Sequence, residues 1–344
     1  MAAPVAAIVL ADDGVVFDGP AVEARPSGGA ETAFAELAAA LAARGHRVTA
    51  LARGARALVH RGVRWQPVEA GVPPTADLYI ANRGHRVLDA CAGARRTVFW
   101  VHNPARYLLK WRYQWPLARR RPTLVFTGAY HAATYPGWAM GGPRRIVPLG
   151  VSDPFLGWVE RAPPPPVAIF VSNPLRGLEA LAELWADAVR PRVPGARLVV
   201  HAGSAVYGAA GDARIAAVLE RVARRAGDGI VLRAPLPKRE LAPVLAASRL
   251  FLYGGSADET FCLAAAEAQA VGLPAVVGAA GALPERVADG VTGFVAHDPA
   301  AMAAAAVRLL TDDGLWQNQH RAALARSASS GWDPVAAAFE ALAI

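Results

Sequence analysis

Two glutamates near the expected start of a helix are the first candidates for chemistry. Within 258–274, Glu259 lies before that start, and Glu267 lies eight residues further on in an otherwise apolar stretch. The first N–H groups of a helix, here those of Phe261 and Cys262, can bind phosphate. A carboxylate among alanines is costly to bury without hydrogen-bond partners, and a sugar or ribose diol would supply two of them. The alternative is a capping acid together with a carboxylate at the helix edge.

A positively charged partner for phosphate follows an expected strand. Arg176 lies between a strand expected at 167–171 and a helix expected at 178–189. Its guanidinium could clamp a phosphate through paired N–H groups. Because the helix dipole disfavours a cation near a helix start, this placement indicates an anion nearby. A surface arginine without a ligand is the alternative.

The first half of the chain offers a histidine and a pair of glycines. His102 ends the strand expected at 97–102, and ligands of parallel sheets bind at the carboxyl ends of strands. A hydrogen bond from its ring to a backbone carbonyl is the alternative. Gly28 and Gly29 precede the helix expected at 31–44 and would let the backbone approach a ligand, unless they form an ordinary loop ending at a serine cap. The loop lacks the G-x-G-x-x-G pattern, which disfavours a nicotinamide dehydrogenase.

Short apolar runs alternate with alanine- and leucine-rich stretches along the whole chain. Continuous apolar runs are typical of strands buried on both faces of a parallel sheet. The expected strands are 6–10, 48–51, 78–81, 97–102, 124–127 and 146–149, then 167–171, 198–201, 230–232, 250–253 and 275–278. The expected helices are 31–44, 178–189, 213–225, 239–248, 261–271, 300–310, 315–328 and 334–342. This pattern predicts an α/β protein of two doubly wound, Rossmann-like domains that face each other across a cleft.

The run of prolines at 163–166 gives the expected domain boundary, because it continues neither a helix nor a central strand. We expect an N-terminal domain at 1–160 and a second domain at 161–330. A terminal helix at 331–344 could pack back on the first domain.

Composition excludes several classes of protein. Apolar residues make up 54% and charged residues 19%, which excludes general disorder. The net charge of +8 belongs to the first half, since 1–160 holds 19 Lys and Arg against 11 Asp and Glu, and 161–344 holds 17 against 17. The 2 cysteines lie far apart and form neither a disulfide framework nor a zinc site. Without a signal peptide or a long apolar run, the sequence favours a cytoplasmic protein.

Taken in order along the chain, the motifs resemble the retaining, nucleotide-sugar-dependent glycosyltransferases of family 4, which have the GT-B fold. The resemblance covers nearly the whole chain and lies in 28–31 with 41–48, in His102-Asn103, in 146–151, in Glu259 with Glu267, in 281–285 and in 290–293. It implies transfer of a sugar to an acceptor hydroxyl with retention at the anomeric carbon. The first domain would bind the acceptor and the second the donor.

The resemblance also implies a role for each candidate in the first domain. The backbone of Gly28 and Gly29 would approach the donor phosphates. His102 would contact the transferred sugar and is a catalytic candidate.

In the second domain, Arg176 would neutralise the diphosphate, Glu259 would bind sugar hydroxyls and Glu267 would bind the ribose. Phosphate would be held by N–H groups of Thr260, Phe261, Cys262 and Leu263. No enzymic nucleophile is evident, and the family is thought to use a same-face displacement in which the leaving phosphate deprotonates the acceptor.

One departure concerns phosphate binding. The family commonly has an arginine just after the first strand of the second domain and a lysine shortly afterwards. Here Ser172-Asn173 occupies the first place, and Arg176 stands near the second. The chain has no Asp-x-Asp motif, which fits metal-independent transfer from a UDP- or GDP-type donor without a further cofactor.

A basic aromatic segment at 106–121 holds six cations and four aromatic residues. Tryptophan, tyrosine and arginine together suit a membrane interface with anionic lipid, or an anionic acceptor. The alternative is a solvated helix face with buried aromatic residues. Nucleic acid is disfavoured, because no recognition motif accompanies the segment.

Two rival functions remain at this point. A nucleotide-sugar epimerase or a phosphorylase could use the same fold. A non-catalytic protein that binds sugar nucleotides is supported only by the Ser172-Asn173 departure.

Overall fold

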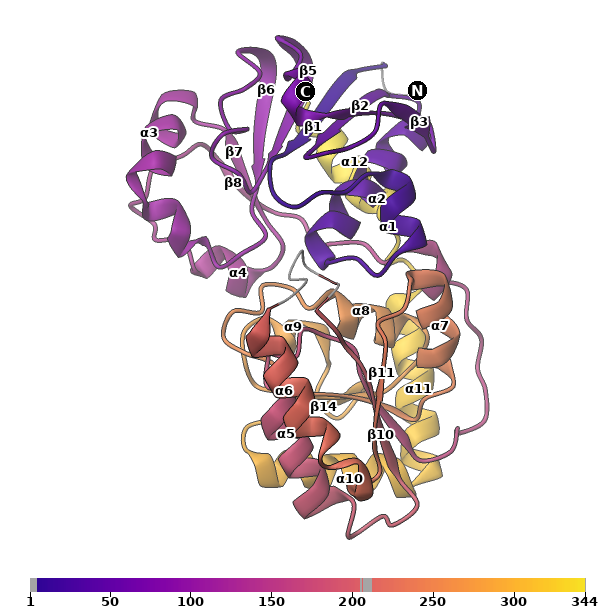
Figure 1. Ribbon diagram of the computed structural model, residues 1–344. Helices are drawn as coiled ribbons and strands as arrows, with labels where there is room; N and C mark the ends of the chain where they lie inside the picture. Colours follow the sequence, from indigo (N-terminus) through magenta and orange to yellow (C-terminus); the bar gives the residue numbers. More distant parts are fainter. Residues whose placement is uncertain (1–4, 205, 207–211, 344) are drawn as a thin grey trace. The chain divides into compact units, whose positions relative to one another are not determined.

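The computed structural model describes residues 5–204, 206 and 212–343 and divides the chain into two compact units (Figure 1). The N-terminal unit consists of Met1–Gly150 and Trp332–Ile344, and the C-terminal unit is Val151–Gly331. The division at Gly150 precedes the boundary expected at residue 160. The reason is that Val151 and Phe155 already belong to the hydrophobic core of the C-terminal unit, so the prolines lie inside that unit.

The N-terminal sheet has the strand order β3-β4-β2-β1-β5-β6-β7-β8. Its strands are β1 (Ala7–Asp12), β2 (Arg47–Ala52), β3 (Leu58–His60), β4 (Val63–Pro67), β5 (Thr75–Asn82), β6 (Gly93–Trp100), β7 (Thr123–Phe126) and β8 (Arg144–Ile146). Neighbours are parallel except β3 with β4. The β3–β4 hairpin was not expected, because its residues are partly polar and partly exposed. The strand expected at 146–149 ends at Ile146, since Pro148 cannot donate a ladder hydrogen bond.

The end of the chain returns to the N-terminal unit. There α12 (Trp332–Glu340) packs on α2 (Gly29–Ala43), as Figure 1 shows. Arg44, which follows α2, contacts Asp333 (Nη1–Oδ1 2.8 Å) and Glu340 (Nη2–Oε2 2.5 Å). Further helices of this unit are α1 (Gly19–Ala24), α3 (Trp111–Arg120), α4 (Ala129–Ala133) and the 3-10 turns Val68–Ala70 and Ala105–Leu109.

The C-terminal sheet is parallel, in the order β11-β10-β9-β12-β13-β14. Its strands are β9 (Val167–Phe170), β10 (Arg197–His201), β11 (Ile230–Arg233), β12 (Leu250–Tyr253), β13 (Ala275–Gly278) and β14 (Gly293–Ala296). Sequence patterns missed β14, a short run that begins with glycine.

The helices of the C-terminal unit follow the expected alternation. They are α5 (Leu178–Leu184) with a π-helical extension at Trp185–Val189, α6 (Ala213–Ala223), α7 (Lys238–Ala246), α8 (Leu263–Ala270), α9 (Leu283–Arg286), α10 (Pro299–Thr311) and α11 (Asp313–Ser327), with 3-10 turns at Asp153–Phe155 and Ala226–Asp228. In the part of the chain that the structure describes, no helix is both long and apolar enough to cross a membrane.

Each sheet has a point where the direction of strand addition reverses. It lies between β1 and β5 in the N-terminal sheet and between β9 and β12 in the C-terminal sheet. Doubly wound sheets bind their ligands just outside the carboxyl ends of the strands at such a switch point. Ligand sites are therefore expected in the segments that follow these four strands.

Candidate functional site

An ion pair between Arg176 and Glu259 lies at the switch point of the C-terminal sheet. Arg176 is in the turn between β9 and α5, and Glu259 is in the loop between β12 and α8. Arg176 Nη1 is 2.6 Å from Glu259 Oε1, and the side chains are 41% and 3% exposed. Because a guanidinium carries five N–H donors, Arg176 can contact Glu259 and an anion from solvent at the same time.

Tyr253 joins the same carboxylate from the end of β12. Its hydroxyl donates to Glu259 Oε1 and accepts from Ser172 Oγ at 3.4 Å. Burial raises the pKa of Tyr253, with further contributions from Cys262 and Glu259, so the phenol keeps its proton and donates. Ser172, just after β9, thus contributes a hydroxyl to this network.

The helix after Glu259 begins later than the sequence predicted. The expected range was 261–271, whereas α8 covers Leu263–Ala270. Cys262 adopts a left-handed backbone (φ 64°), so the helix cannot begin before this residue. This conformation is strained for a residue with a side chain. The N–H groups of the helix start therefore belong to the first residues of α8 and not to Phe261 and Cys262.

A glycine in the following segment fixes the backbone of Glu259. Gly281 has φ 58°, and a Cβ there would lie 2.6 Å from the Glu259 carbonyl oxygen and 2.8 Å from that of Ser256. The N–H of Ala282 donates to the Glu259 carbonyl at 2.9 Å. The 281–285 motif thus positions the loop that carries Glu259.

Glu267 lies inside α8 and is 1% exposed. Its Oε1 is 2.6 Å from Nζ of Lys238, the first residue of α7. The sequence pattern favours a hydroxyl partner for this buried carboxylate and gives no sign of the lysine. The structure provides a cation from a neighbouring helix.

At the switch point of the N-terminal sheet, buried Asp12 forms an ion pair with Arg83, whose side chain is 17% exposed. Arg83 Nε is 2.9 Å from Asp12 Oδ2, and Nη2 is 2.7 Å from Glu31 Oε1. Asp12 also accepts from the Asn82 amide and from the Gly14 N–H at 2.7 Å. Burial acts to lower the pKa of Arg83, but Asp12 and Glu31 outweigh it and raise that pKa, so the guanidinium stays charged.

His102 is buried just beyond β6, with its ring 4.5 Å from that of Trp100. Burial holds the pKa of His102 well below its usual range, and Arg83 and His131 lower it further. The imidazole is therefore neutral at neutral pH. A neutral ring can donate one hydrogen bond and accept another.

His131 positions the residue next to His102. Its Nε2–H donates to the Asn103 carbonyl at 2.9 Å, and its Nδ1 accepts from the Thr127 N–H at 3.1 Å. Burial lowers the pKa of His131 to about 4. The contact at Nδ1 requires the neutral ring, because a protonated nitrogen cannot accept from the Thr127 N–H.

The glycine pair forms the start of α2. This helix begins at Gly29, two residues earlier than expected, and Gly28 is its cap. The Ser27 hydroxyl donates to the Arg25 carbonyl at 3.1 Å, so the serine cap that was the alternative for this described segment is not formed.

The predicted residues fall into two groups, one in each unit. The structure brings Arg176 and Glu259 into contact, and it places Gly28, Gly29 and His102 in the N-terminal unit. Sequence reasoning missed several polar residues of these networks, among them Asp12, Arg83, Tyr253 and Lys238. The criterion that selected His102, a polar residue at or just after the carboxyl end of a strand, would have found the first three.

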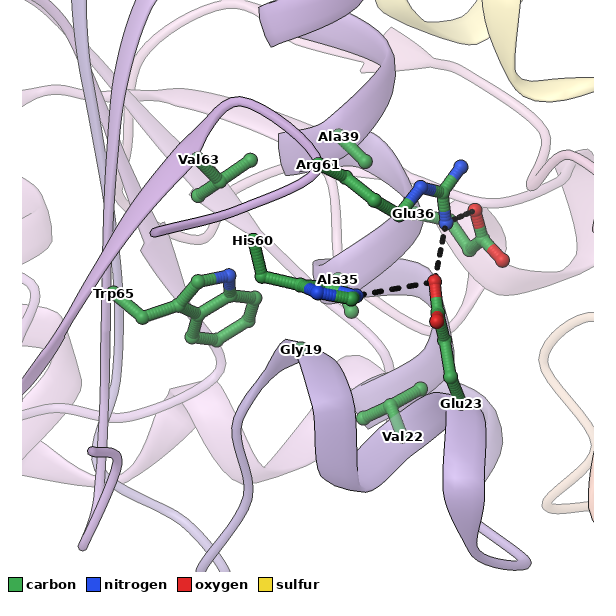
Figure 2. A pocket seen from close by; sticks show the side chains of 10 residues that line it. All are labelled: Gly19, Val22, Glu23, Ala35, Glu36, Ala39, His60, Arg61, Val63 and Trp65. Carbon is green, nitrogen blue, oxygen red and sulfur yellow. Dashed lines mark hydrogen bonds and ion pairs between the residues drawn. The ribbon is translucent and has the colours of Figure 1, made fainter. Parts of the chain in front are cut away.

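A small hollow in the N-terminal unit lies between α1, α2 and the β3–β4 hairpin (Figure 2). Its volume is about 10 Å³, room for about one water molecule. Arg61 Nη1 bridges Glu36 (2.9 Å) and Glu23 (3.4 Å), and His60 Nε2 is 3.2 Å from Glu23. Within the described ranges, no group of three or more His, Cys, Asp or Glu could hold a metal ion. These ion pairs therefore hold the hairpin against the helices.

Comparison with known sequences gives a partial match. Residues 165–312 match the model of the family Glycosyl transferases group 1. The chain is 38% identical over 124 residues to a D-inositol 3-phosphate glycosyltransferase of Streptomyces avermitilis, and 38% identical over 135 residues to one of Xylanimonas cellulosilytica. These matches cover 35% and 38% of this chain but 26% and 32% of the relatives, so the aligned part spans about a quarter to a third of their length.

Solved structures are similar over almost the whole chain. Sucrose-phosphate synthase from Thermosynechococcus elongatus has a TM-score of 0.75 at 19% identity, covering 97% of both chains. Anabaena Alr3699/HepE in complex with UDP-glucose has a TM-score of 0.73 at 14% identity, covering 97% of this chain and 98% of that one. The predicted GT-B fold is confirmed by these neighbours.

Proposed function

We propose that this chain, whose residues 165–312 match the model of the family Glycosyl transferases group 1, transfers a sugar from a nucleotide-diphosphate sugar to an acceptor hydroxyl. The donor is of the UDP or GDP type, and transfer retains the configuration of the anomeric carbon. Two similarities support this proposal. The relatives are named D-inositol 3-phosphate glycosyltransferases, which supports sugar transfer, and the similar HepE structure is in complex with UDP-glucose, which supports the donor class.

The observation that carries the proposal is the contact between Arg176 and Glu259 at the C-terminal switch point. This contact puts the half-exposed guanidinium of Arg176 beside the buried carboxylate of Glu259, in the loop that leads to the start of α8. The cation suits a diphosphate and the carboxylate suits sugar hydroxyls. In this site Glu267 would bind the ribose, and the backbone at 260–263 with the start of α8 would hold phosphate.

The chemistry follows from these charges. As the bond between the anomeric carbon and the phosphate oxygen breaks, negative charge builds on the departing diphosphate, where Arg176 and the start of α8 would stabilise it. The acceptor oxygen attacks from the same face, and its proton passes to the departing phosphate oxygen. Neutral His102 would bind a hydroxyl of the sugar, and the backbone at Gly28 and Gly29 would approach the phosphates.

We propose that this transfer needs neither a metal ion nor a further cofactor. The positive charge comes from Arg176 and the helix start, and the chain lacks Asp-x-Asp. Excess EDTA should leave the initial rate unchanged. A rate that EDTA abolishes and Mg²⁺ restores would contradict metal independence.

The transfer is tested by incubating the protein with UDP- and GDP-sugars and a panel of hydroxyl acceptors, while released nucleotide diphosphate is measured. Arg176→Gln should lower kcat about 100-fold, by analogy with the loss of one charge-stabilising donor. Arg221→Gln is the matched control, because Arg221 is equally exposed (42%) and pairs with Glu179 on the surface of the same unit. Equal rates for the two variants would contradict the proposal.

The rival functions have separate signatures. An epimerase would convert the donor sugar without any acceptor, so the donor is also incubated alone. A phosphorylase would consume the product in the presence of phosphate. A non-catalytic protein would bind nucleotide diphosphates in calorimetry and release none from any donor.

We also propose that the N-terminal unit contacts an anionic membrane surface. Trp111, Trp115 and Trp138 are between 59% and 78% exposed, and they are the exposed tryptophans among the described residues. The rings of Trp111 and Trp115 lie 5.8 Å apart on α3. Gln114 lies on the same helix face and accepts from the Met140 N–H at 3.3 Å, which brings the 136–140 loop beside it.

The charge of this surface favours anionic lipid. No Asp or Glu occurs in 90–152, which contains ten Lys and Arg. Arg119 and Arg120 pair with Asp89, while Tyr113 is buried, so only part of the predicted 106–121 segment forms the surface. Exposed indoles beside cations are typical of membrane interfaces.

Flotation with phosphatidylcholine vesicles, with and without phosphatidylglycerol, tests this contact. Each cation near such a surface contributes about 1 kcal/mol, so K110Q/R112Q should weaken binding about 30-fold. W111A/W115A should also weaken it, whereas R224Q/R225Q on the C-terminal unit is the control. Binding that survives both changes would mean that α3 is only a solvated face.

A further inference from the structure

Lys238 occupies a place that its own helix does not favour. It is the first residue of α7, and Arg239 follows it. Cations at a helix start are disfavoured by the helix dipole. The position of Lys238 is therefore explained by contacts outside α7.

Those contacts come from two other elements of the C-terminal unit. The Nζ of Lys238 lies 2.6 Å from Oε1 of Glu267 on α8, and 5.7 Å from the ring centroid of Phe155. Phe155 is fully buried, and the Lys238 side chain is 18% exposed. The ammonium is thus held between a carboxylate and an aromatic face.

The type of cation matters for what Glu267 can still bind. A lysine ammonium is a point charge that engages one carboxylate oxygen, as it does here. An arginine would present a planar fork that matches both oxygens of a carboxylate. A carboxylate has about four acceptor positions, so one held by lysine can still accept from hydroxyl groups.

We propose that Lys238 is a positioning residue for the ribose of the donor. It holds the Glu267 carboxylate in one orientation, and it leaves that carboxylate able to accept from ribose hydroxyls. This inference rests on the proposed function, in which Glu267 binds the ribose.

Calorimetry with UDP and with its 2′-deoxy form tests the inference on the full-length protein; GDP and its 2′-deoxy form are used if GDP is the nucleotide bound. Lys238→Arg should keep the melting temperature of the wild type but weaken nucleotide binding about tenfold, the loss of about one hydrogen bond to a charged group. The ratio of its affinity for the ribonucleotide to its affinity for the 2′-deoxy form should fall towards one. Lys238→Met should lower the melting temperature as well, because Glu267 stays buried without its counter-charge. Arg239→Gln, at the exposed neighbouring position, should change neither quantity.

The outcomes separate this inference from the proposed function. If Lys238→Arg binds the nucleotide with wild-type affinity and preference, Lys238 forms only a structural ion pair and the inference is wrong. A wild type that does not distinguish the ribo from the 2′-deoxy form also overturns it, while leaving sugar transfer intact. A wild type that binds neither UDP nor GDP overturns the proposed donor site together with this inference.

Discussion

Arg176 and Glu259 are 83 residues apart in the chain, yet their side chains meet at 2.6 Å. The strand order of the C-terminal sheet explains the contact, because β9 and β12 are neighbours there and both residues follow their carboxyl ends. A third group, the Tyr253 hydroxyl, donates to the same carboxylate oxygen. The site is thus a product of topology, and its parts can be tested one at a time.

Tyr253→Phe removes the phenol that donates to Glu259. The variant should lose about 1 kcal/mol of stability, as is usual for one hydrogen bond, and about tenfold in kcat because Glu259 is less firmly oriented. Tyr79→Phe is the control, since Tyr79 is also buried and its hydroxyl donates to the Val87 carbonyl in the N-terminal unit. A similar loss of kcat in both variants would mean that the effect is one of stability.

Asp12→Ala leaves Arg83 buried with only part of its counter-charge. Loss of one partner from a buried ion pair typically costs 3–5 kcal/mol, so we expect about 3 kcal/mol less stability in urea unfolding. Asp77→Ala is the control, because Asp77 is about a third exposed, lies 3.6 Å from exposed Arg95 and accepts one hydrogen bond from the Ala7 N–H at 2.8 Å. That change should cost only about 1 kcal/mol, mainly from the lost hydrogen bond. Equal costs would show that the Asp12–Arg83 network does not stabilise the unit.

Acid should weaken the fold through His131. Its pKa is about 4 in the folded chain and about 6.5 when unfolded, so below pH 6.5 the unfolded state takes up a proton that the folded state does not. Stability is therefore fully present above pH 6.5 and falls as the pH approaches 4, by about 3 kcal/mol from this residue. Burial of His102 acts in the same direction.

Urea unfolding of the wild type and of His131→Gln at a series of pH values measures this contribution. The variant should be less stable at pH 7, because its contacts to Asn103 and Thr127 are lost, but its stability should fall less on acidification. Parallel pH profiles for the two proteins would contradict the assignment to His131.

Much of the fold could be predicted because buried parallel strands have a clear apolar signature. The strands around Ile8, Ile80 and Phe170 are continuous apolar runs, and the structure has them as β1, β5 and β9. The β3–β4 hairpin lacks that signature, since Arg64 is exposed beside buried Trp65. The helix start at Leu263 was missed because the left-handed backbone of Cys262 is a conformation that is usual for glycine.

The candidate site could be predicted less completely than the fold. Glu259 stood out because it precedes an expected helix start and Glu267 because it lies in an apolar stretch, but their partners Tyr253 and Lys238 did not stand out. The spacing of residues along the sequence shows which side chains share one face of a single helix or strand. These partners, however, come from other strands and helices. The Lys238–Glu267 contact joins residues 29 positions apart, which no helical or strand period relates.

The central claim is that the carboxylate of Glu259 serves sugar transfer from a nucleotide-diphosphate sugar. The most direct measurement is the rate of nucleotide diphosphate release by Glu259→Gln and by the wild type, at saturating donor and acceptor. Glutamine keeps the shape of the side chain and removes its charge, so the rate should fall about 100-fold while the melting temperature changes little. A variant that releases nucleotide diphosphate as fast as the wild type would contradict the claim.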